Sequence, residues 1–598
     1  MSSLLISKQS RSRKVMIVAA FATFFMPFGI AVAKEDSGES ADRRLQALYK
    51  AEYDWRKQQN AMVKDADGEW LPGNRFPSVD AASQEARRRY WEAALAELEQ
   101  IPLRELSHEE RINAAVFRQI IESRLAEVRY RTYEAPLNSD SLFWTHLSPR
   151  GSLADAGQYR SYIARMGDLP RFFSEQMENM RAGLARGYSV PRVTLQGRDQ
   201  SFAPYMQEGS DNPFWSPMES MPDSIPADLQ RELQAEARKA IRASVIPAYR
   251  GMHRFFVDEY LPETRTTLSV QDLPQGDAFY RSQVKAYTTL ALSPEEIHQR
   301  GLKEVARIRA EMEVVKGQTG FVGDMPAFLQ YLRTDPQFYA KTPHELLAFS
   351  AYVAKRVDGA LGDTLGMLPR RRFTILPVPD AIAPFYTAGR GGLDSCLMNT
   401  YDLPSRPLYT LTALTLHECA PGHALQAAIA NETAGDIPQF RADNYFSGYG
   451  EGWGLYTEWL GTKMGVYDTP YEEFGRLTYE MWRACRLVVD TGIHLYGWSR
   501  ERALKYMREH TALSEHEITT EVDRYISWPG QALSYKLGEM LIRSKRAQAE
   551  EALGAEFDQR YFHDTILKLR SVPLPVLASE LDAWIEGGGK NPYETGEG

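Results

Sequence analysis

Apolar residues recur along most of this chain with the period of an α-helix. After Ser107, which begins a capping pattern, the apolar positions are Ile112, Val116, Ile120 and Leu125. Three further segments begin with the same kind of pattern, at Ser293, Thr342 and Ser514. The helix after Ser293 is expected to stop near Gly317. The chain is therefore predicted to be mainly α-helical.

Patterns typical of β-strands are rare and lie close together. The two best are residues 373–376 and 396–399, both shortly before residue 417. The sequence has no fixed-period repeat and no glycine-rich phosphate-binding loop. We expect a small β-sheet next to the helix that contains residue 417, in an otherwise multi-helix fold.

Two breaks in the helical pattern suggest a division of the chain. Residues 195–225 are rich in Pro, Ser, Met and Asp and are expected to form a long loop. A second break lies near residues 262–276. We expect a helical N-terminal lobe at residues 34–265 and a helical C-terminal lobe at residues 266–598, either as two units or as one domain.

The first 33 residues have the pattern of a secretory signal. Residues 1–14 carry basic residues and no acidic ones, residues 15–32 are uncharged, and Ala31-Val32-Ala33 is a typical cleavage site. A membrane anchor is the alternative, but the uncharged run is short for crossing a bilayer and contains Pro27 and Gly29. We therefore expect a signal peptide at residues 1–33, cleavage after Ala33, and a periplasmic or secreted protein without a stable membrane anchor.

Composition and charge limit the classes of molecule that this protein is expected to bind. The 598 residues are 43% hydrophobic and 25% charged, as in an ordinary globular protein. The formal net charge of −9 becomes more negative once the basic signal is removed, which argues against nucleic acid and anionic membranes as partners. The three cysteines cannot build a disulfide framework, so buried free thiols are expected, with a single bridge as the alternative.

The candidate chemistry is concentrated in the segment from His417 to His423. Two histidines and a carboxylate can hold a zinc ion, and Glu418, next to the first histidine, is expected to take a proton from water. In a straight helix, side chains six residues apart point about 120° away from each other. Pro421 and Gly422 predict a kink or local unwinding that brings the two histidines together.

Glu451 is expected to be the third ligand of one zinc ion per chain. It opens a helical pattern after a glycine-rich turn, and Glu458 returns to nearly the same face about two turns later. Glu458 is expected to hold a metal-binding histidine through its other ring nitrogen. Two solvated helix acids are the structural alternative. Manganese, cobalt or iron could replace zinc at such a site.

Five residues are candidates for contact with a substrate. Tyr535 and His494 could donate a hydrogen bond to the oxyanion of a tetrahedral intermediate, although both could be ordinary packed side chains. Arg524 and Lys536 could bind a terminal carboxylate, or pair with neighbouring acids. Asn399 lies on a predicted strand that could pair with an extended substrate backbone.

These motifs resemble those of the bacterial proteins grouped as domain of unknown function 885. The resemblance covers most of residues 45–590 and is carried by His417 to Gln426, Glu451 to Glu458, and the segments 399–404, 489–499 and 524–536. The chain departs from the pattern at Ala424, where family members often have a second histidine. At greater distance it is similar to the gluzincin peptidases, which implies a two-lobed helical fold with a deep cleft and a bound zinc ion.

Three functions are consistent with the sequence. The first is a zinc-dependent metallopeptidase that hydrolyses short peptides. The second is a zinc-dependent hydrolase of small non-peptide amides or esters, because the same site can attack those bonds. The third is a metal-free envelope protein that binds peptides without chemistry. The complete set of His417, Glu418, His423 and Glu451 favours an enzyme.

Overall fold

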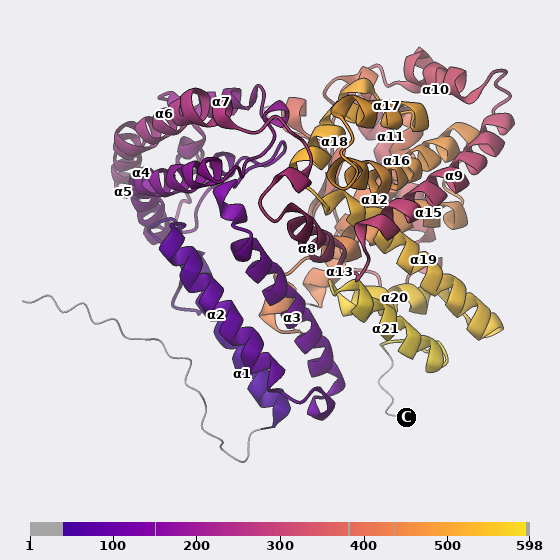
Figure 1. Ribbon diagram of the computed structural model, residues 1–598, viewed down its shortest axis with the longest axis horizontal. Helices are drawn as coiled ribbons and strands as arrows, with labels where there is room; N and C mark the ends of the chain where they lie inside the picture. Colours follow the sequence, from indigo (N-terminus) through magenta and orange to yellow (C-terminus); the bar gives the residue numbers. More distant parts are fainter. Residues whose placement is uncertain (1–39, 150, 381–382, 434, 436, 594–598) are drawn as a thin grey trace, which may run out of the picture.

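The computed structural model describes residues 40–593 except 150, 381–382, 434 and 436. The predicted signal peptide, residues 1–33, lies outside these residues. In the described part of the chain, no helix combines the length and apolar character needed to cross a bilayer. The prediction of a mainly α-helical fold is confirmed, with α1–α7 on one side of the molecule and most of the later helices on the other (Figure 1).

From residue 40 onward, the described first half of the chain consists mainly of helices and contains one short hairpin. Strands β1 (Met62–Lys64) and β2 (Trp70–Pro72) are antiparallel. The helices are α1 (Ala41–Gln59), α2 (Ala81–Glu99), α3 (His108–Arg129), α4 (Ala156–Ala185), α5 (Ala227–Ala240), α6 (Ile246–Arg254) and α7 (Leu261–Glu263). The predicted loop at 195–225 contains two 3-10 helices, Arg198–Met206 and Pro213–Met218.

The second half contains the predicted small sheet and the remaining helices. The sheet has the order β3-β5-β4, with β3 (Thr374–Pro377) parallel and β4 (Gly389–Gly391) antiparallel to β5 (Ser395–Met398). The helices are α8 (Gly276–Thr288), α9 (Pro294–Gln318), α10 (Met325–Thr334), α11 (Pro343–Ala360), α12 (Leu408–Glu418), α13 (His423–Glu432), α14 (Gln439–Ala442), α15 (Ser447–Met464), α16 (Pro470–His494), α17 (Arg500–His510), α18 (Glu515–Ser527), α19 (Ser534–Leu553), α20 (Gln559–Leu569) and α21 (Leu574–Glu586).

The predicted helix starts are confirmed. The side chains of Ser107, Thr342 and Ser514 each accept a hydrogen bond from the backbone N–H three residues later. Ser293 forms a full capping box with Glu296. These contacts satisfy backbone donors that a helix leaves without a partner at its first turn.

Helices α12 and α16 form the centre of the second half. Every residue of α12 from Tyr409 to His417 is buried, and so is every residue of α16 from Phe474 to His494. Helix α12 packs against α11, α15 and α16, and β4 lies beside it. The segment that contains His417 is therefore held on several sides by rigid elements.

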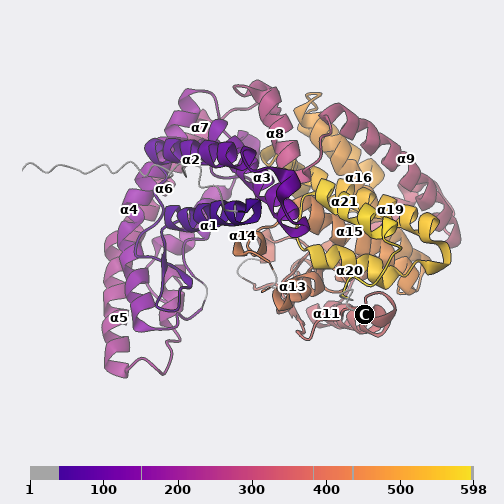
Figure 2. The same cartoon turned by 90° about the horizontal axis from the view of Figure 1, so that it is seen from below.

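Hydrophobic clusters connect the two halves of the chain. One cluster lies almost entirely between Phe76 and Tyr260 and is built mainly from α4–α6. Helices α1–α3, in contrast, share a cluster with α15, α19, α20 and α21. Helix α14 lies beside α1 and α3 (Figure 2). The N-terminal helices α1–α3 thus pack against the half of the chain that contains His417.

The structure corrects the expectation that all three cysteines are free. Cys396 on β5 and Cys419, directly after α12, form a disulfide, while Cys485 is a buried free thiol. The two partners are 23 residues apart in sequence, and the pairing follows from the position of the small sheet against the end of α12. The bridge ties β5 to the residue that follows Glu418.

Loss of this bridge is expected to destabilise the protein. Because the disulfide closes a loop of 23 residues, replacing both Cys396 and Cys419 by Ser should lower the free energy of unfolding by about 3 kcal/mol. Denaturant unfolding of the double variant and the wild type measures this difference. A reductant should destabilise the wild type and leave the double variant unchanged; equal stability of the two proteins would contradict the expectation.

Candidate metal centre

The helical segment that begins at Leu408 is interrupted at the predicted place. Helix α12 ends at Glu418 and α13 begins at His423, and the four residues between them include Pro421 and Gly422. A Cβ atom on Gly422 would lie 1.8 Å from the carbonyl oxygen of His417, so only glycine allows this close return of the chain. The interruption brings the rings of His417 and His423 to 4.8 Å between centroids.

Helix α15 supplies the third group from a distant part of the sequence. Glu451 lies in its second turn, and Gly454 faces the ring of His417. A Cβ atom on Gly454 would come within 2.7 Å of the Cε1 and Nε2 atoms of His417. The absence of a side chain at residue 454 therefore lets α15 approach α12 closely enough for Glu451 to reach both histidines.

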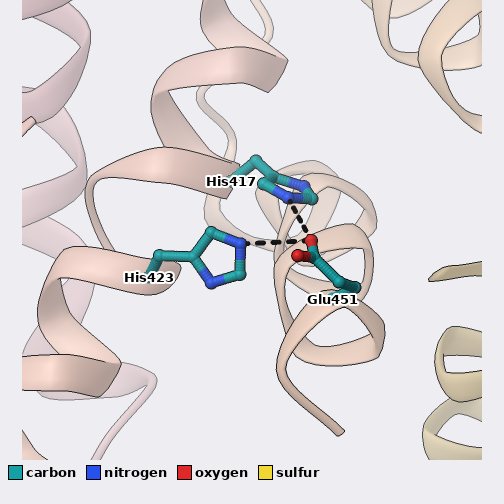
Figure 3. Close-up of side chains that lie close together, drawn as sticks. All are labelled: His417, His423 and Glu451. Atoms are coloured by element: carbon teal, nitrogen blue, oxygen red, sulfur yellow. Dashed lines mark ion pairs between the residues drawn. The ribbon is translucent and has the colours of Figure 1, made fainter. Parts of the chain in front are cut away.

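Figure 3 shows the three side chains pointing toward one another from α12, α13 and α15. The Oε2 atom of Glu451 lies 3.5 Å from His417 Nε2 and 3.3 Å from His423 Nε2. A tetrahedral zinc ion with bonds of about 2.0–2.2 Å separates its ligand atoms by about 3.3–3.6 Å. The donor set and the two oxygen–nitrogen separations fit such an ion, and all three donor atoms lie within 4.8 Å of one another.

A fourth side chain orients His417. Its Nδ1 atom is hydrogen-bonded to Glu458 Oε1 at 2.7 Å, and Glu458 is 1% exposed. This is the contact expected for Glu458 from its position two turns after Glu451. Because Nδ1 is hydrogen-bonded to a carboxylate, the lone pair of Nε2 is directed to the position between the three groups.

The site has an electrostatic character suited to a cation. Burial alone lowers the pKa of His417, but hydrogen bonds to Glu451 and Glu458 outweigh burial and raise this pKa to about 9. Burial alone raises the pKa of Glu451, yet its contacts with His417 and His423 hold it well below the usual value. Carboxylates thus surround the imidazoles, and a cation bound between them would be stabilised.

Glu418 lies beside this group of side chains and is held by the small sheet. Its Oε2 atom accepts a hydrogen bond of 2.6 Å from the backbone N–H of Gly391 on β4. Glu418 lines the same cavity of about 880 Å³ as His417, His423 and Glu451. The carboxylate is therefore positioned to act on a molecule bound in that cavity.

Two tyrosines line the cavity near these side chains. The ring of Tyr535, at the start of α19, lies 6.4 Å from the ring of His417. Burial and the nearby charge of Glu451 raise the pKa of Tyr535, so its hydroxyl group remains a hydrogen-bond donor at neutral pH. Tyr445 donates a hydrogen bond of 3.3 Å to Glu451 Oε1.

Three of the predicted substrate-binding or catalytic residues do not line this cavity. His494 is fully buried, its Nε2 atom lies 2.8 Å from the carbonyl oxygen of Tyr525, and burial lowers its pKa to about 3. Lys536 is fully buried between the carboxylates of Glu480 and Glu539. These contacts assign His494 and Lys536 to the packing of α16, α18 and α19.

Asn399 is the third of these residues, and Arg524 occupies an intermediate position. The side chain of Asn399 donates hydrogen bonds to the carbonyl oxygens of Ala383, Tyr386 and Thr387, which holds the loop before β4. Arg524 does line the cavity, but its guanidinium is bound to Glu521 and Gln531. Asn399 and Arg524 thus both make contacts within the protein, and Arg524 also lines the cavity.

The sequence analysis missed several residues that line the cavity. Arg483 and Arg486 on α16 line it, as do Trp482 and Tyr445. Both arginines are buried, although buried charges are costly without a partner, but α16 carries several other charged residues. The sequence around Arg483 and Arg486 therefore contains no signal that distinguishes them as functional candidates.

One comparison with known proteins shows the family of the chain, and another shows its fold. The model of a bacterial protein family of unknown function, DUF885, matches residues 66–581. A candidate lipoprotein from Colwellia psychrerythraea is 26% identical, with a TM-score of 0.83 over 92% of this chain and 100% of that one. A second candidate lipoprotein of unknown function, from Shewanella oneidensis, is 16% identical and has a TM-score of 0.61 over 91% of this chain and 99% of that one. No curated protein sequence matches the chain.

Proposed function

This chain belongs to the DUF885 family of bacterial proteins of unknown function, and we propose that it is a zinc-dependent metallopeptidase that hydrolyses short peptides. The observation that carries the proposal is the convergence of His417, His423 and Glu451 from three helices on one position. The proposed site is gluzincin-like: Glu418 is the residue that activates water, and Glu458 is the residue that orients His417. Its location is proposed as periplasmic or secreted.

His417, His423 and Glu451 would hold the ion, and their donor atoms match the preference of zinc for imidazole and carboxylate. When bound, zinc supplies a Lewis acid that polarises a carbonyl group and a water molecule. Glu458 keeps His417 in the tautomer that presents Nε2. The protein thus contributes a preorganised arrangement of three ligand atoms.

Glu418 acts as the general base and then as the general acid. The N–H group of Gly391 fixes one carboxylate oxygen, which leaves the other free to accept a proton from the attacking water. The same carboxyl group returns this proton to the leaving nitrogen of the peptide. Tyr535 donates a hydrogen bond to the oxygen that becomes negative.

The dimensions of the cavity favour a small or extended substrate. A volume of about 880 Å³ accommodates a short peptide and excludes a folded protein. Polar and aromatic side chains from α3, α8, α15 and α16 line the walls. These features favour peptides over the small esters that the same chemistry would cleave.

The test is a combined measurement of bound metal and of hydrolysis products. Elemental analysis of the purified protein should find about one zinc per chain. Mass spectrometry of a peptide mixture should show products with the wild type. If only acyl esters or non-peptide amides are cleaved, the protein is a hydrolase of those compounds and not a peptidase. Activity that a chelator does not affect would overturn the proposed metal centre.

Removal of the carboxylate that orients His417 is expected to weaken zinc binding. Glu458→Gln loses the negative charge 2.7 Å from His417 Nδ1, and zinc affinity should fall about 10- to 100-fold. Competition with a chromogenic chelator measures the change. Glu550→Gln, on an exposed part of α19, is the matched control and should leave zinc affinity at the wild-type value.

Zinc affinity is expected to rise with pH up to about pH 9. Because the pKa of His417 is raised to about 9, its ring carries a second proton below about pH 9 in the metal-free protein, and zinc must displace the proton on Nε2. Apparent affinity should therefore increase about tenfold per pH unit over this range, from His417 alone. Chelator competition between pH 6.5 and 9, corrected for the chelator's own protonation, checks this slope; a flat profile would contradict it.

A further inference from the structure

The wall of the cavity formed by α16 carries two arginines with unused hydrogen-bond donors. The side chains of Arg483 and Arg486 are 5% and 3% exposed. The Nε atom of Arg483 and the Nη1 atom of Arg486 have no hydrogen-bond partner among the described residues. Because an unsatisfied donor on a buried charged group is costly, these atoms point to a partner that comes from outside the chain.

Aromatic rings hold both guanidinium groups in place. The Cζ atoms of Arg483 and Arg486 lie 4.1 and 4.3 Å from the ring centre of Trp482. Arg486 also lies 4.2 Å from the ring centre of Tyr535. Stacked guanidinium groups of this kind keep their N–H edges available for a planar acceptor such as a carboxylate.

A hydrogen-bond network supports this arrangement from behind. The hydroxyl group of Tyr525 accepts hydrogen bonds from Arg486 Nε at 3.0 Å and from the indole of Trp482 at 2.9 Å. It donates in turn to Glu521 Oε2 at 2.7 Å. The side chains of Arg486 and Trp482 are therefore fixed before any ligand binds, which lowers the entropy cost of binding.

The local charge balance also favours an anion. Glu521 is shared between Arg486 and Arg524, and Glu458, the carboxylate near Arg483 at 3.4 Å, is already hydrogen-bonded to His417. Glu517 also interacts electrostatically with Arg483 and Arg486, and burial raises its pKa. The two carboxylates in contact with the arginine pair, Glu521 and Glu458, are thus each shared with another side chain.

We propose that Arg483 and Arg486 form a subsite for a carboxylate group of the substrate, next to the candidate metal centre. This subsite rests on the proposed peptidase function and narrows its substrates to peptides that present a carboxylate close to the cleaved bond. It differs from the role expected for Arg524 and Lys536: Lys536 does not line the cavity and is paired with Glu480, and Arg524 shares Glu521 with Arg486.

The position of the subsite limits the spacing between the carboxylate and the cleaved bond. Arg486 lies 4.2 Å from the ring of Tyr535, and that ring lies 6.4 Å from the ring of His417. Taken together, these separations limit the guanidinium–imidazole distance to about three extended residues. The bound carboxylate therefore belongs to the C-terminus, or to an acidic side chain, within about three residues of the cleaved bond.

Binding measured without turnover tests the subsite. Isothermal titration of the full-length Glu418→Gln protein uses three probes: N-acetyl-alanyl-phenylalanine with a free carboxylate, its C-terminal amide, and N-acetyl-alanyl-glutamate amide. The free acid should bind about 10- to 100-fold more tightly than its amide, since hydrogen bonds to charged groups are strong. If the glutamate amide binds as tightly as the free acid, the subsite accepts a side-chain carboxylate as well.

Arginine variants locate the effect. Adding Arg483→Gln or Arg486→Gln should reduce the preference for the acid over the amide to less than about threefold. Arg390→Gln, which removes an exposed guanidinium from the β4 wall of the same cavity, is the matched control and should keep the full preference. Arg486→Lys retains the charge in case the glutamine variants do not fold, and it should keep only part of the preference.

Two outcomes would overturn the subsite. One is equal affinity for the acid and the amide, including no measurable binding of either. The other is a preference that survives in all folded variants of Arg483 and Arg486. Both concern binding alone, whereas a failure of the peptidase proposal appears as absence of Glu418-dependent cleavage by the wild type, so the two can be distinguished.

Discussion

The Glu418→Gln protein is expected to lose about 10²- to 10⁴-fold in kcat/KM for peptide hydrolysis while it retains its metal. The amide oxygen of a glutamine can still accept the hydrogen bond from the N–H group of Gly391, so the local structure should be preserved. The amide cannot, however, accept a proton from water at neutral pH. Rate measurements, together with elemental analysis of the same samples, check both parts.

A matched replacement controls for the loss of one negative charge. Glu208→Gln changes an exposed glutamate outside the cavity lining and should leave both rate and metal content unchanged. If Glu418→Gln retains near wild-type activity with its metal bound, Glu418 is not the general base. If metal and activity disappear together, the carboxylate acts in metal binding instead.

The His423→Ala protein is expected to lose its bound metal and the stability that the metal contributes. Two remaining ligands, His417 and Glu451, leave an incomplete site, so the zinc content should fall from about one per chain to less than about 0.1 after dialysis. Zinc at about a thousand times its dissociation constant should stabilise the wild type by about 4 kcal/mol and leave the variant unchanged. Thermal unfolding with and without zinc gives this readout independently of activity.

An exposed histidine provides the control for this variant. His108 has a side chain that is 61% exposed and lies on the surface of α3. His108→Ala should keep both the metal content and the response to zinc. Stoichiometric zinc in His423→Ala, or an equal response to zinc in both variants, would show that His423 is not a ligand.

Much of the candidate centre could be predicted because most of its residues lie close together in the sequence. His417, Glu418 and His423 lie within seven residues. Pro421 and Gly422, between the two histidines, predict that the helix is interrupted at that point. The structure shows this interruption between α12 and α13. Glu451 and Glu458 could be paired with the histidines because residues about two turns apart share a helix face.

The substrate side could not be predicted in the same way. Lys536 and Arg483 are both cations in helices near the end of the chain, and nothing in their neighbouring residues separates them. The fold surrounds Lys536 with the carboxylates of Glu304, Glu480 and Glu539, but places Arg483 on the cavity wall. Which cation remains available depends on contacts between helices far apart in sequence.

The sequence by itself determined the helical class, the helix starts and the position of the break at Pro421-Gly422. It also identified the three side chains that come together near this break, His417, His423 and Glu451. These features depend on residues within a few turns of one another, where backbone geometry fixes the relation of side chains. Only the tertiary structure decided the Cys396–Cys419 pairing, the burial of His494 and Asn399, and the position of Arg483 and Arg486 in the cavity wall. Those outcomes depend on how distant helices and strands pack, because the partner that satisfies a buried polar group can come from any part of the chain.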